Sequence, residues 1–339
     1  MPKRFLLLLL VVGILAAGCA RPLSDNCPKD CVGLNLSSRQ LKGINLSEAQ
    51  LMDANLNKAK MVKTNLTKAN LTGAQIMEAN LESANLNDAR LVGADLSFSN
   101  LRNAEMNNVD MRGANLQSVS MIRVDLTTAE MRGVLFKRAE LIGCDLSEAK
   151  LSGVEMYEAN LSGAILVGAN LNGSVLSLSD FSGAKMHGVQ ITGSWVNLAR
   201  LVGADLGSSN LSGTTFFGTD LTGANLANAK LNGANLVGAN LSGVDLRGAD
   251  LTGAILELPV PSEEDKTFSY ENLTGASFLS TLNQTEMSRV LADSRVSALT
   301  EVNLKPLLKD VILQGVLVDQ NTVWPFGFEV PNSVIYQEQ

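Results

Sequence analysis

The apolar residues of this chain recur with a period of five. A large apolar residue occupies every fifth position from Leu36 to Leu256 without a slip, and each is Leu, Met, Ile, Phe or Val. Two residues before these positions, from Ala49 to Ala254, the chain has Ala, Ser, Thr, Cys or Val. A helix has a period of 3.6 residues and a strand a period of two, so neither produces this pattern. The repeat predicts a different backbone over one uninterrupted region.

Stretches such as 224–228, ANLAN, and 239–243, ANLSG, resemble the A-(D/N)-L-X-X unit of pentapeptide-repeat proteins. The resemblance covers residues 34–258 and implies an all-β fold, a right-handed four-sided β-helix in which twenty residues make one coil. Both repeating rows then point inward, because a large side chain on each side leaves room near the corner for a small one only. About eleven coils, stacked at about 4.8 Å, predict a rod on the order of 50 Å long.

The three remaining positions of each pentapeptide are mostly polar and are expected to face solvent. Glycine recurs two places after the large residue, as at Gly73, Gly93 and Gly113. A tight corner tolerates glycine best, since glycine has no Cβ to restrict its dihedral angles. The small inner row also contains Cys144, which we expect to be a buried thiol that behaves as a small apolar residue.

The first residues have the features of an export signal. Lys3 and Arg4 precede an apolar run over residues 5–17, which is shorter than the roughly 20 residues of a membrane-spanning helix. Residues 16–19, AAGC, resemble the lipobox of bacterial lipoproteins, although Ala16 stands where that family prefers leucine. We therefore predict a signal peptide over residues 1–18 and lipidation of Cys19. A conventionally cleaved secreted protein and an uncleaved anchor are the alternatives.

Residues 19–33 are predicted to form a tether and an N-terminal cap. Cys27 and Cys31 lie four positions apart there. In an oxidising compartment such a pair favours a disulfide, whereas a metal site would need two more ligands, and no cysteine or histidine lies near in sequence.

The period stops at Leu256, and Pro259 and Pro261 follow it. We predict that residues 259–339 form a small irregular capping region, with a helical insertion around residues 285–293. Asn321–Phe328 resembles the Thr-x-Trp-Pro-x-Gly-Phe ending of some pentapeptide-repeat proteins. Spaced pairs of small and large residues recur in a shifted frame and predict closing coils: Ala276/Phe278, Val311/Leu313 and Val316/Val318.

Outward apolar residues gather on one of the four predicted sides, the side of Leu36, Leu56 and every twentieth residue after them. They are Phe98, Leu135, Tyr157, Val175, Leu178, Trp195, Leu198, Phe217 and Val237. Such a stripe exceeds what scattered apolar residues give. Either residues 258–339 fold back over it, or it is the surface of a homodimer or of a docked partner.

Composition and motifs argue against catalysis and against nucleic-acid binding. The net charge is −7 and the sequence pI about 4.9, so there is no bulk attraction to nucleic acid. His187 is the single histidine, and no phosphate loop, nucleophile elbow or zinc motif occurs. Glu105, Asp125 and Asp145 form a row that could bind a divalent cation, although such rows are more often solvated. We expect no enzyme and no cofactor.

These features predict a non-catalytic scaffold in the cell envelope, attached to the membrane through its N-terminal lipid and docking an unknown protein or envelope partner. The alternative function is a DNA mimic that inhibits a topoisomerase such as gyrase, as some pentapeptide-repeat proteins do. That function needs a strongly acidic rod in the cytoplasm. Basic residues among the acidic ones and the export signal argue against it, including Lys58, Lys60, Lys63 and Lys68.

Overall fold

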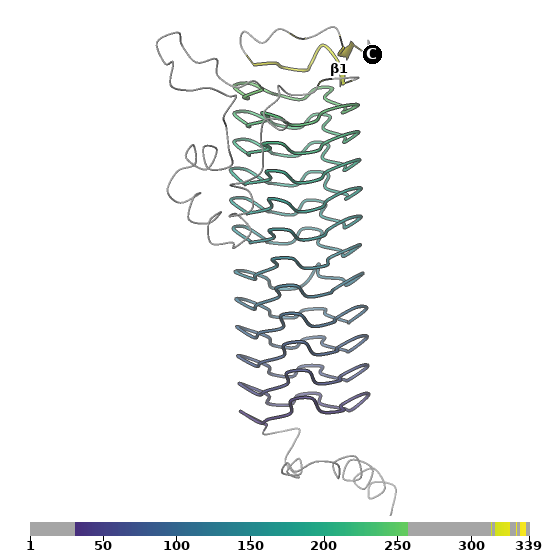
Figure 1. Ribbon diagram of the computed structural model, residues 1–339, viewed down its shortest axis with the longest axis vertical. Coiled ribbons are helices and arrows are strands. Elements are labelled where there is room, and N and C mark those ends of the chain that lie inside the picture. The colour runs from purple at the N-terminus through teal and green to yellow at the C-terminus, as the bar shows by residue number, and fades with distance from the viewer. Residues whose placement is uncertain (1–30, 257–312, 314–315, 326–329, 331–332, 337–339) are drawn as a thin grey trace, which may run out of the picture.

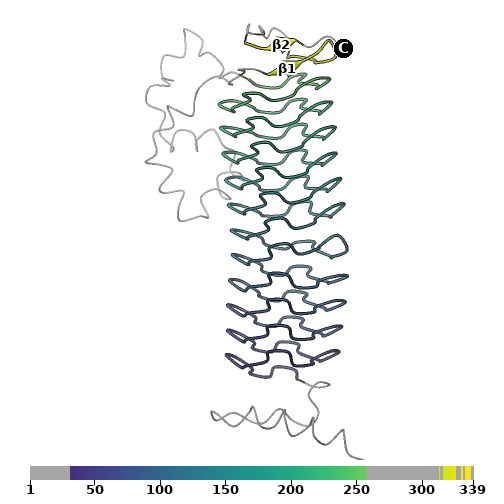
Figure 2. The ribbon, with the colours of Figure 1, turned by 90° about the vertical axis from the view of Figure 1, so that its right-hand side faces the viewer.

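The computed structural model describes residues 31–256, 313, 316–325, 330 and 333–336. Over residues 31–256 the chain winds into a rod of stacked coils (Figures 1 and 2). Parallel β-bridges join each residue that precedes a core position to the residue twenty positions later, from Asn35↔Asn55 to Asn235↔Ile255. Four such bridges in every twenty residues give the coil four sides, as the period of five predicts.

Three kinds of backbone hydrogen bond hold neighbouring coils together, and one of them joins the Ser38 N–H to the Asn57 carbonyl at 2.8 Å. The Leu36 N–H donates to the Asn55 carbonyl at 2.7 Å, and the Asn55 N–H donates back to the Leu34 carbonyl at 2.9 Å. A further bond, within one coil, closes each corner, as between the Ala49 N–H and the Leu46 carbonyl at 3.2 Å. These bonds already begin at Cys31, whose N–H donates to Gln50 at 2.8 Å. The first coil therefore has the same backbone as the later ones, although Leu34 and Ile44 are half-buried.

The core is the bore of the rod, and both inner rows line it as predicted. Its largest fully buried side chains are Phe136, Phe181 and Phe216. Buried hydroxyl groups in the small row donate to carbonyls of the coil below, for example Thr64 to Leu41 at 2.7 Å. Because their donors are used in this way, serine and threonine can replace alanine without the cost of an unpaired buried polar group.

The Asn or Asp that precedes most core residues has a local role. Its Oδ1 accepts a hydrogen bond from the N–H two residues later, as between Asn65 and Thr67 at 3.0 Å. This bond fixes the entry to the corner, which explains why short amide and carboxylate side chains fill the position.

The corner residue, two places after each core residue, has a left-handed backbone at every position from Gly33 to Gly253 except Thr128. Thr128 is also the one β-branched residue in this row. A β-branched side chain disfavours positive φ, since its branch collides with the backbone. The sequence therefore places one unsuitable residue among otherwise compatible corners.

The ladder of bridges is interrupted beside Thr128. Within residues 31–256, the series lacks the bridges expected between Glu105 and Asp125 and between Glu130 and Lys150. The Asn108 N–H donates instead to the Thr128 Oγ1 at 2.9 Å. One coil near the middle of the rod is accordingly irregular (Figure 2).

The described residues near the C-terminus extend the stack. Strand β1 (Leu317–Val318) bridges Asp245 through Leu317, and β2 (Ile335–Tyr336) pairs with β1 in parallel (Figure 2). Val316 and Val318 are both fully buried. They occupy the small and large inner positions that their spacing predicts.

Several predicted features lie outside the described residues. These are the signal peptide, Cys19, Cys27, the pair Ala276/Phe278 and the helical insertion around residues 285–293. Among the described residues no helix has the length and apolar character needed to cross a membrane.

Candidate interaction face

The apolar face, defined as the side of the rod that carries Leu36, Leu56 and every twentieth residue after them, brings the predicted outward residues into adjacent rows. Val175 and Trp195 form a β-bridge, so these two side chains start from neighbouring coils on the same row. Leu178 and Leu198 are corner residues one coil apart. The Leu198 Cδ2 lies 2.8 Å from where a Cβ on Gly218 would stand, so Leu198 covers the backbone of the following coil. Pairing between residues twenty positions apart thus keeps these side chains in line, as the twenty-residue coil predicts.

Exposure along this face decreases from Phe98 to Val237. Phe98 is 59% exposed and Leu135 42% exposed. Tyr157, Leu178, Trp195 and Leu198 are half-buried. Phe217 and Val237 are only 5% and 3% exposed. The sequence correctly places all of these residues on one side, but it does not predict that the last two are buried.

One apolar residue of this face is absent from the predicted set. Ile255 precedes core residue Leu256 and is 47% exposed. Its β-bridge to Asn235 places it in the same row as Val175 and Trp195. The signal that identifies it is its position in the twenty-residue register, at the last coil before the repeat stops.

Charged side chains lie beside Tyr157, in the middle of the apolar face. The Lys137 Nζ lies 5.7 Å from the centre of the Tyr157 ring. The Arg138 Nε donates to the Glu158 Oε2 at 2.9 Å between neighbouring corners. A cation over an aromatic face is attracted by the ring's quadrupole. The Lys137 contact orients the Tyr157 ring, and charged groups therefore lie among the apolar residues of this face.

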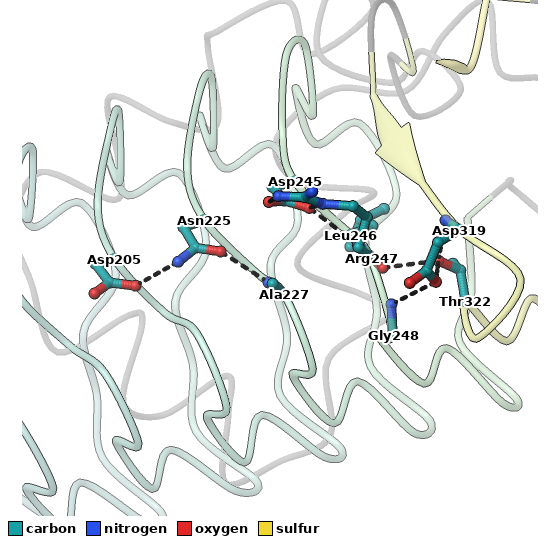
Figure 3. Close-up of polar contacts among 9 residues, drawn as sticks. All are labelled: Asp205, Asn225, Ala227, Asp245, Leu246, Arg247, Gly248, Asp319 and Thr322. Carbon is teal, nitrogen blue, oxygen red and sulfur yellow. Dashed lines mark hydrogen bonds and ion pairs between the residues drawn. The ribbon is translucent and has the colours of Figure 1, made fainter. Parts of the chain in front are cut away.

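A polar junction fixes the C-terminal residues to the last regular coil (Figure 3). The Asp319 Oδ1 accepts the N–H groups of Gly248 and Asn321, both at 2.9 Å. The Thr322 hydroxyl donates to the Leu246 carbonyl at 2.9 Å. Burial alone would raise the pKa of Asp319, but the hydrogen bonds from Gly248, Asn321 and Thr322 outweigh it and hold this pKa below its ordinary value.

One charged pair near the polar junction lies within a single pentapeptide. The Arg247 guanidinium contacts Asp245 through two hydrogen bonds of 2.9 and 2.6 Å (Figure 3). This bidentate contact is the main reason that the pKa of Asp245 lies below its ordinary value. On the same side of the rod, the Asn225 Nδ2 donates to Asp205 at 2.8 Å, which links adjacent coils.

The cysteines occupy two different environments. Cys31 is 2% exposed and disulfide-bonded, while Cys27 and Cys19 lie outside the described residues, so the pairing of Cys27 with Cys31 stays a prediction. Cys144 is fully buried as a free thiol, as its place in the small row predicts. Its Sγ donates to the Met121 carbonyl at 2.7 Å, like the hydroxyls of that row. Burial raises the pKa of the Cys144 thiol to about 12.

The acidic row does not form a metal site in the described part of the chain. There, no group of three or more His, Cys, Asp or Glu side chains is placed to hold a metal ion. The Glu105 Oε2 accepts hydrogen bonds from Asn85 and Asn87 at 2.9 and 3.0 Å instead. The interruption between Glu105 and Asp125 also separates two members of the row. His187 lies on the outer surface, with its Nδ1 3.9 Å from the Asp205 Oδ2.

Comparison with known proteins identifies the repeat. Residues 30–193 and 197–257 match the family model described as pentapeptide repeats. No curated protein sequence matches the chain.

Solved structures with the same type of repeat also match. HetL, a pentapeptide repeat protein involved in heterocyst differentiation regulation from the cyanobacterium Nostoc, is 27% identical over 66% of this chain and 83% of its own, with a TM-score of 0.24. A pentapeptide repeat protein from the thylakoid lumen of Arabidopsis thaliana is 23% identical over 34% and 70%, with a TM-score of 0.25. QnrB1, a plasmid-mediated fluoroquinolone resistance protein, is 17% identical over 48% and 78%, with a TM-score of 0.29.

Proposed function

Because this chain belongs to the pentapeptide-repeat family, whose members are generally non-catalytic structural or interaction proteins, we propose that it is a scaffold that docks a macromolecular partner in the cell envelope. The observation that carries this proposal is the apolar face. Tyr157, Leu178, Trp195 and Leu198 lie in register on one side of the rod and are neither fully buried nor part of the bore. Aromatic and aliphatic side chains of this kind are the usual anchors of protein interfaces.

The rod is well suited to docking because its surface is ordered before a partner arrives. Coil-to-coil backbone bonds such as Leu176 N–H to Trp195 carbonyl, at 2.7 Å, hold the face at a fixed spacing. Binding to such a surface loses little backbone entropy, so more of the contact energy contributes to affinity.

We further propose that the rod is exported and attached to a membrane by a lipid on Cys19. This proposal rests on the sequence of residues 1–19. Cys19 precedes Cys31, the first residue of the coils, by twelve positions. An extended chain spans about 3.3–3.6 Å per residue, so the first coil would lie within about 40 Å of the lipid.

Metabolic labelling with a palmitate analogue tests the anchor. The wild-type chain should incorporate the label and sediment with membranes, whereas Cys19→Ala should lose both properties. Cys144→Ala is the matched control, because that thiol is buried in the bore and should not affect labelling. Equal labelling of wild type and Cys19→Ala would contradict lipidation at Cys19.

The alternative function, a DNA mimic that inhibits gyrase, is not favoured by any observation on the described residues. The surface is of mixed charge, with ion pairs between coils such as Lys58–Glu78 at 3.5 Å and Arg102–Glu140 at 3.3 Å. A mimic of duplex DNA would need a continuous acidic surface instead.

Site-specific photo-crosslinking in intact cells tests the docking function. A photoreactive amino acid would replace Phe98 on the apolar face or Asn103, a corner residue of the adjacent side in the same coil. Both positions are exposed and have a left-handed backbone, so the two substitutions are matched. We expect a discrete adduct from position 98 and none from position 103. Adducts of equal yield from both positions, or none from either, would contradict a specific docking face.

A further inference from the structure

The residues near the C-terminus return to the register of the coils after a long insertion. Leu317 bridges Asp245, so it takes the place that position 265 would hold in an uninterrupted repeat, 52 positions earlier. With the same offset Leu313 takes the core position above Leu241, and it is 5% exposed. Residues 257–308 are therefore an insertion of 52 residues between two parts of one coil.

The insertion begins on the apolar face. Leu256 is the last core residue of that side, and Ile255 just before it bridges Asn235. The Leu236 N–H donates to the Ile255 carbonyl at 2.8 Å, so the chain leaves the rod directly above the coil of Val237. Val237 therefore lies one coil before the point at which the insertion begins.

The described part of the rod does not explain the burial of this part of the face. Val237 and Val167 are the same residue type at the same position, one place after a core residue. Val167, on another side, is 37% exposed, whereas Val237 is 3% exposed. Phe217, also one place after a core residue, is 5% exposed. Ser97, a smaller residue at the same position beside Phe98, is 4% exposed, so a small side chain can be buried there by the rod itself. For side chains as large as valine and phenylalanine, a cover from outside the rod explains the difference from Val167.

The insertion has the composition that such a cover requires. It contains the large apolar residues Phe268, Tyr270 and Phe278. Met287, Val290 and Leu291 have the i, i+3, i+4 spacing of an amphipathic helix, which has one apolar side to bury. A segment of this length has a poor ratio of core to surface by itself, so it gains most by packing on an existing apolar surface.

We propose that residues 257–308 pack against the apolar face of their own rod, over the coils that carry Trp195, Phe217 and Val237. Phe98 and Leu135, which stay exposed, are then the part of the face that is available to a partner. If this segment covers the coil of Trp195 and Leu198, the scaffold function rests on the part of the face nearer the N-terminus, and crosslinking at position 98 tests that function separately.

Removal of residues 257–308 tests the inference and preserves the repeat. Joining Leu256 to Lys309 places Val311 and Leu313 at the next small and large inner positions, because the insertion length equals the register offset. The chain has two tryptophans, so Trp324→Phe in both proteins makes Trp195 the single fluorophore. We expect the deletion to shift Trp195 emission to the red and to remove its protection from acrylamide.

Equal emission and quenching of Trp195 in the two proteins would overturn the proposal. Protection that depends on protein concentration in the full chain, with a dimer in sedimentation, would overturn it in favour of a second copy.

A pair of point variants keeps the test decisive if the deletion variant does not fold. Val237→Lys in the full chain should increase the quenching of Trp195, because a lysine under the cover displaces it. Val167→Lys, on another side of the rod, should leave Trp195 unchanged. Equal quenching in these two variants would overturn the proposal.

Discussion

Replacement of Thr128 by glycine should repair the irregular coil and stabilise the rod. Thr128 is the one corner residue between Gly33 and Gly253 without a left-handed backbone, and glycine adopts that conformation without steric cost. A left-handed corner at 128 would let the Asn108 N–H donate to the backbone carbonyl of Thr127, as equivalent residues do in other coils. The bridges between Glu105 and Asp125 and between Glu130 and Lys150 would then form.

The size of the effect follows from the bonds gained and lost. Met106, Asn108, Asp125, Thr128, Met131, Gly133 and Lys150 lack the coil-to-coil N–H bond made by their equivalents elsewhere in residues 31–256. If three of these bonds form, at about 1 kcal/mol each, the gain is about 3 kcal/mol. Loss of the Thr128 hydroxyl bond to Asn108 costs about 1 kcal/mol, and the greater freedom of glycine in the unfolded chain about 0.5–1 kcal/mol. The expected net stabilisation is about 1 kcal/mol.

Urea unfolding combined with amide hydrogen exchange measures this prediction. The amides of Asn108 and Met131 should become protected in Thr128→Gly. Ser118→Gly is the control, because position 118 is already left-handed and its N–H makes the regular bond to the Lys137 carbonyl at 2.8 Å. If Thr128→Gly leaves the Asn108 amide as exchangeable as in wild type, the corner conformation is not the cause of the interruption.

Three further predictions concern the bore and the C-terminal junction. Leu146→Asp places an unpaired carboxylate at a fully buried position and should cost at least about 4 kcal/mol in urea unfolding, whereas Lys150→Asp on the surface should change little. Cys144, whose pKa is raised to about 12, should resist iodoacetamide at pH 8 in the folded chain and react after unfolding in urea; equal rates would contradict its burial. Folding lowers the pKa of Asp319, so this carboxylate stabilises the folded chain above pH 3.8 and the contribution disappears as the pH falls below that value. Asp319→Asn should therefore lower the Tm at pH 7 and have a smaller effect at pH 3, and an equal effect at both would refute this assignment.

The period of five predicts the bore because each inward residue is identified by its position alone. Cys144, Val316 and Val318 are buried for that reason, even though the last two lie beyond a long interruption of the repeat. The same rule places the outward residues of the apolar face on one side.

Other features depend on contacts that the repeat does not encode. Val237 faces outward by register and is nevertheless buried, because exposure depends on what lies outside the rod. Leu317 bridges Asp245 and Val323 bridges Asp250, so this stretch has one residue more than the regular spacing of five. Asp319 lies in this irregular stretch, and the repeat therefore does not predict its role. The interruption at Thr128 has a signal in the sequence, because Thr128 is the single β-branched residue in the corner row. The recurrence of glycine in that row does not by itself reveal it.

The buried hydroxyl bonds described above have a consequence for how this sequence can change over time. Thr64, Ser174 and Thr214 each donate to a carbonyl 23 residues earlier, and Cys144 does the same with its thiol. Ser99 and Ser179 donate instead to the carbonyl three residues earlier in their own coil. A backbone acceptor is thus available to each of these small donors. Exchanges among alanine, serine, threonine and cysteine in this row can therefore accumulate with little loss of stability. The sequence of the inner row can diversify while the diameter of the rod stays the same.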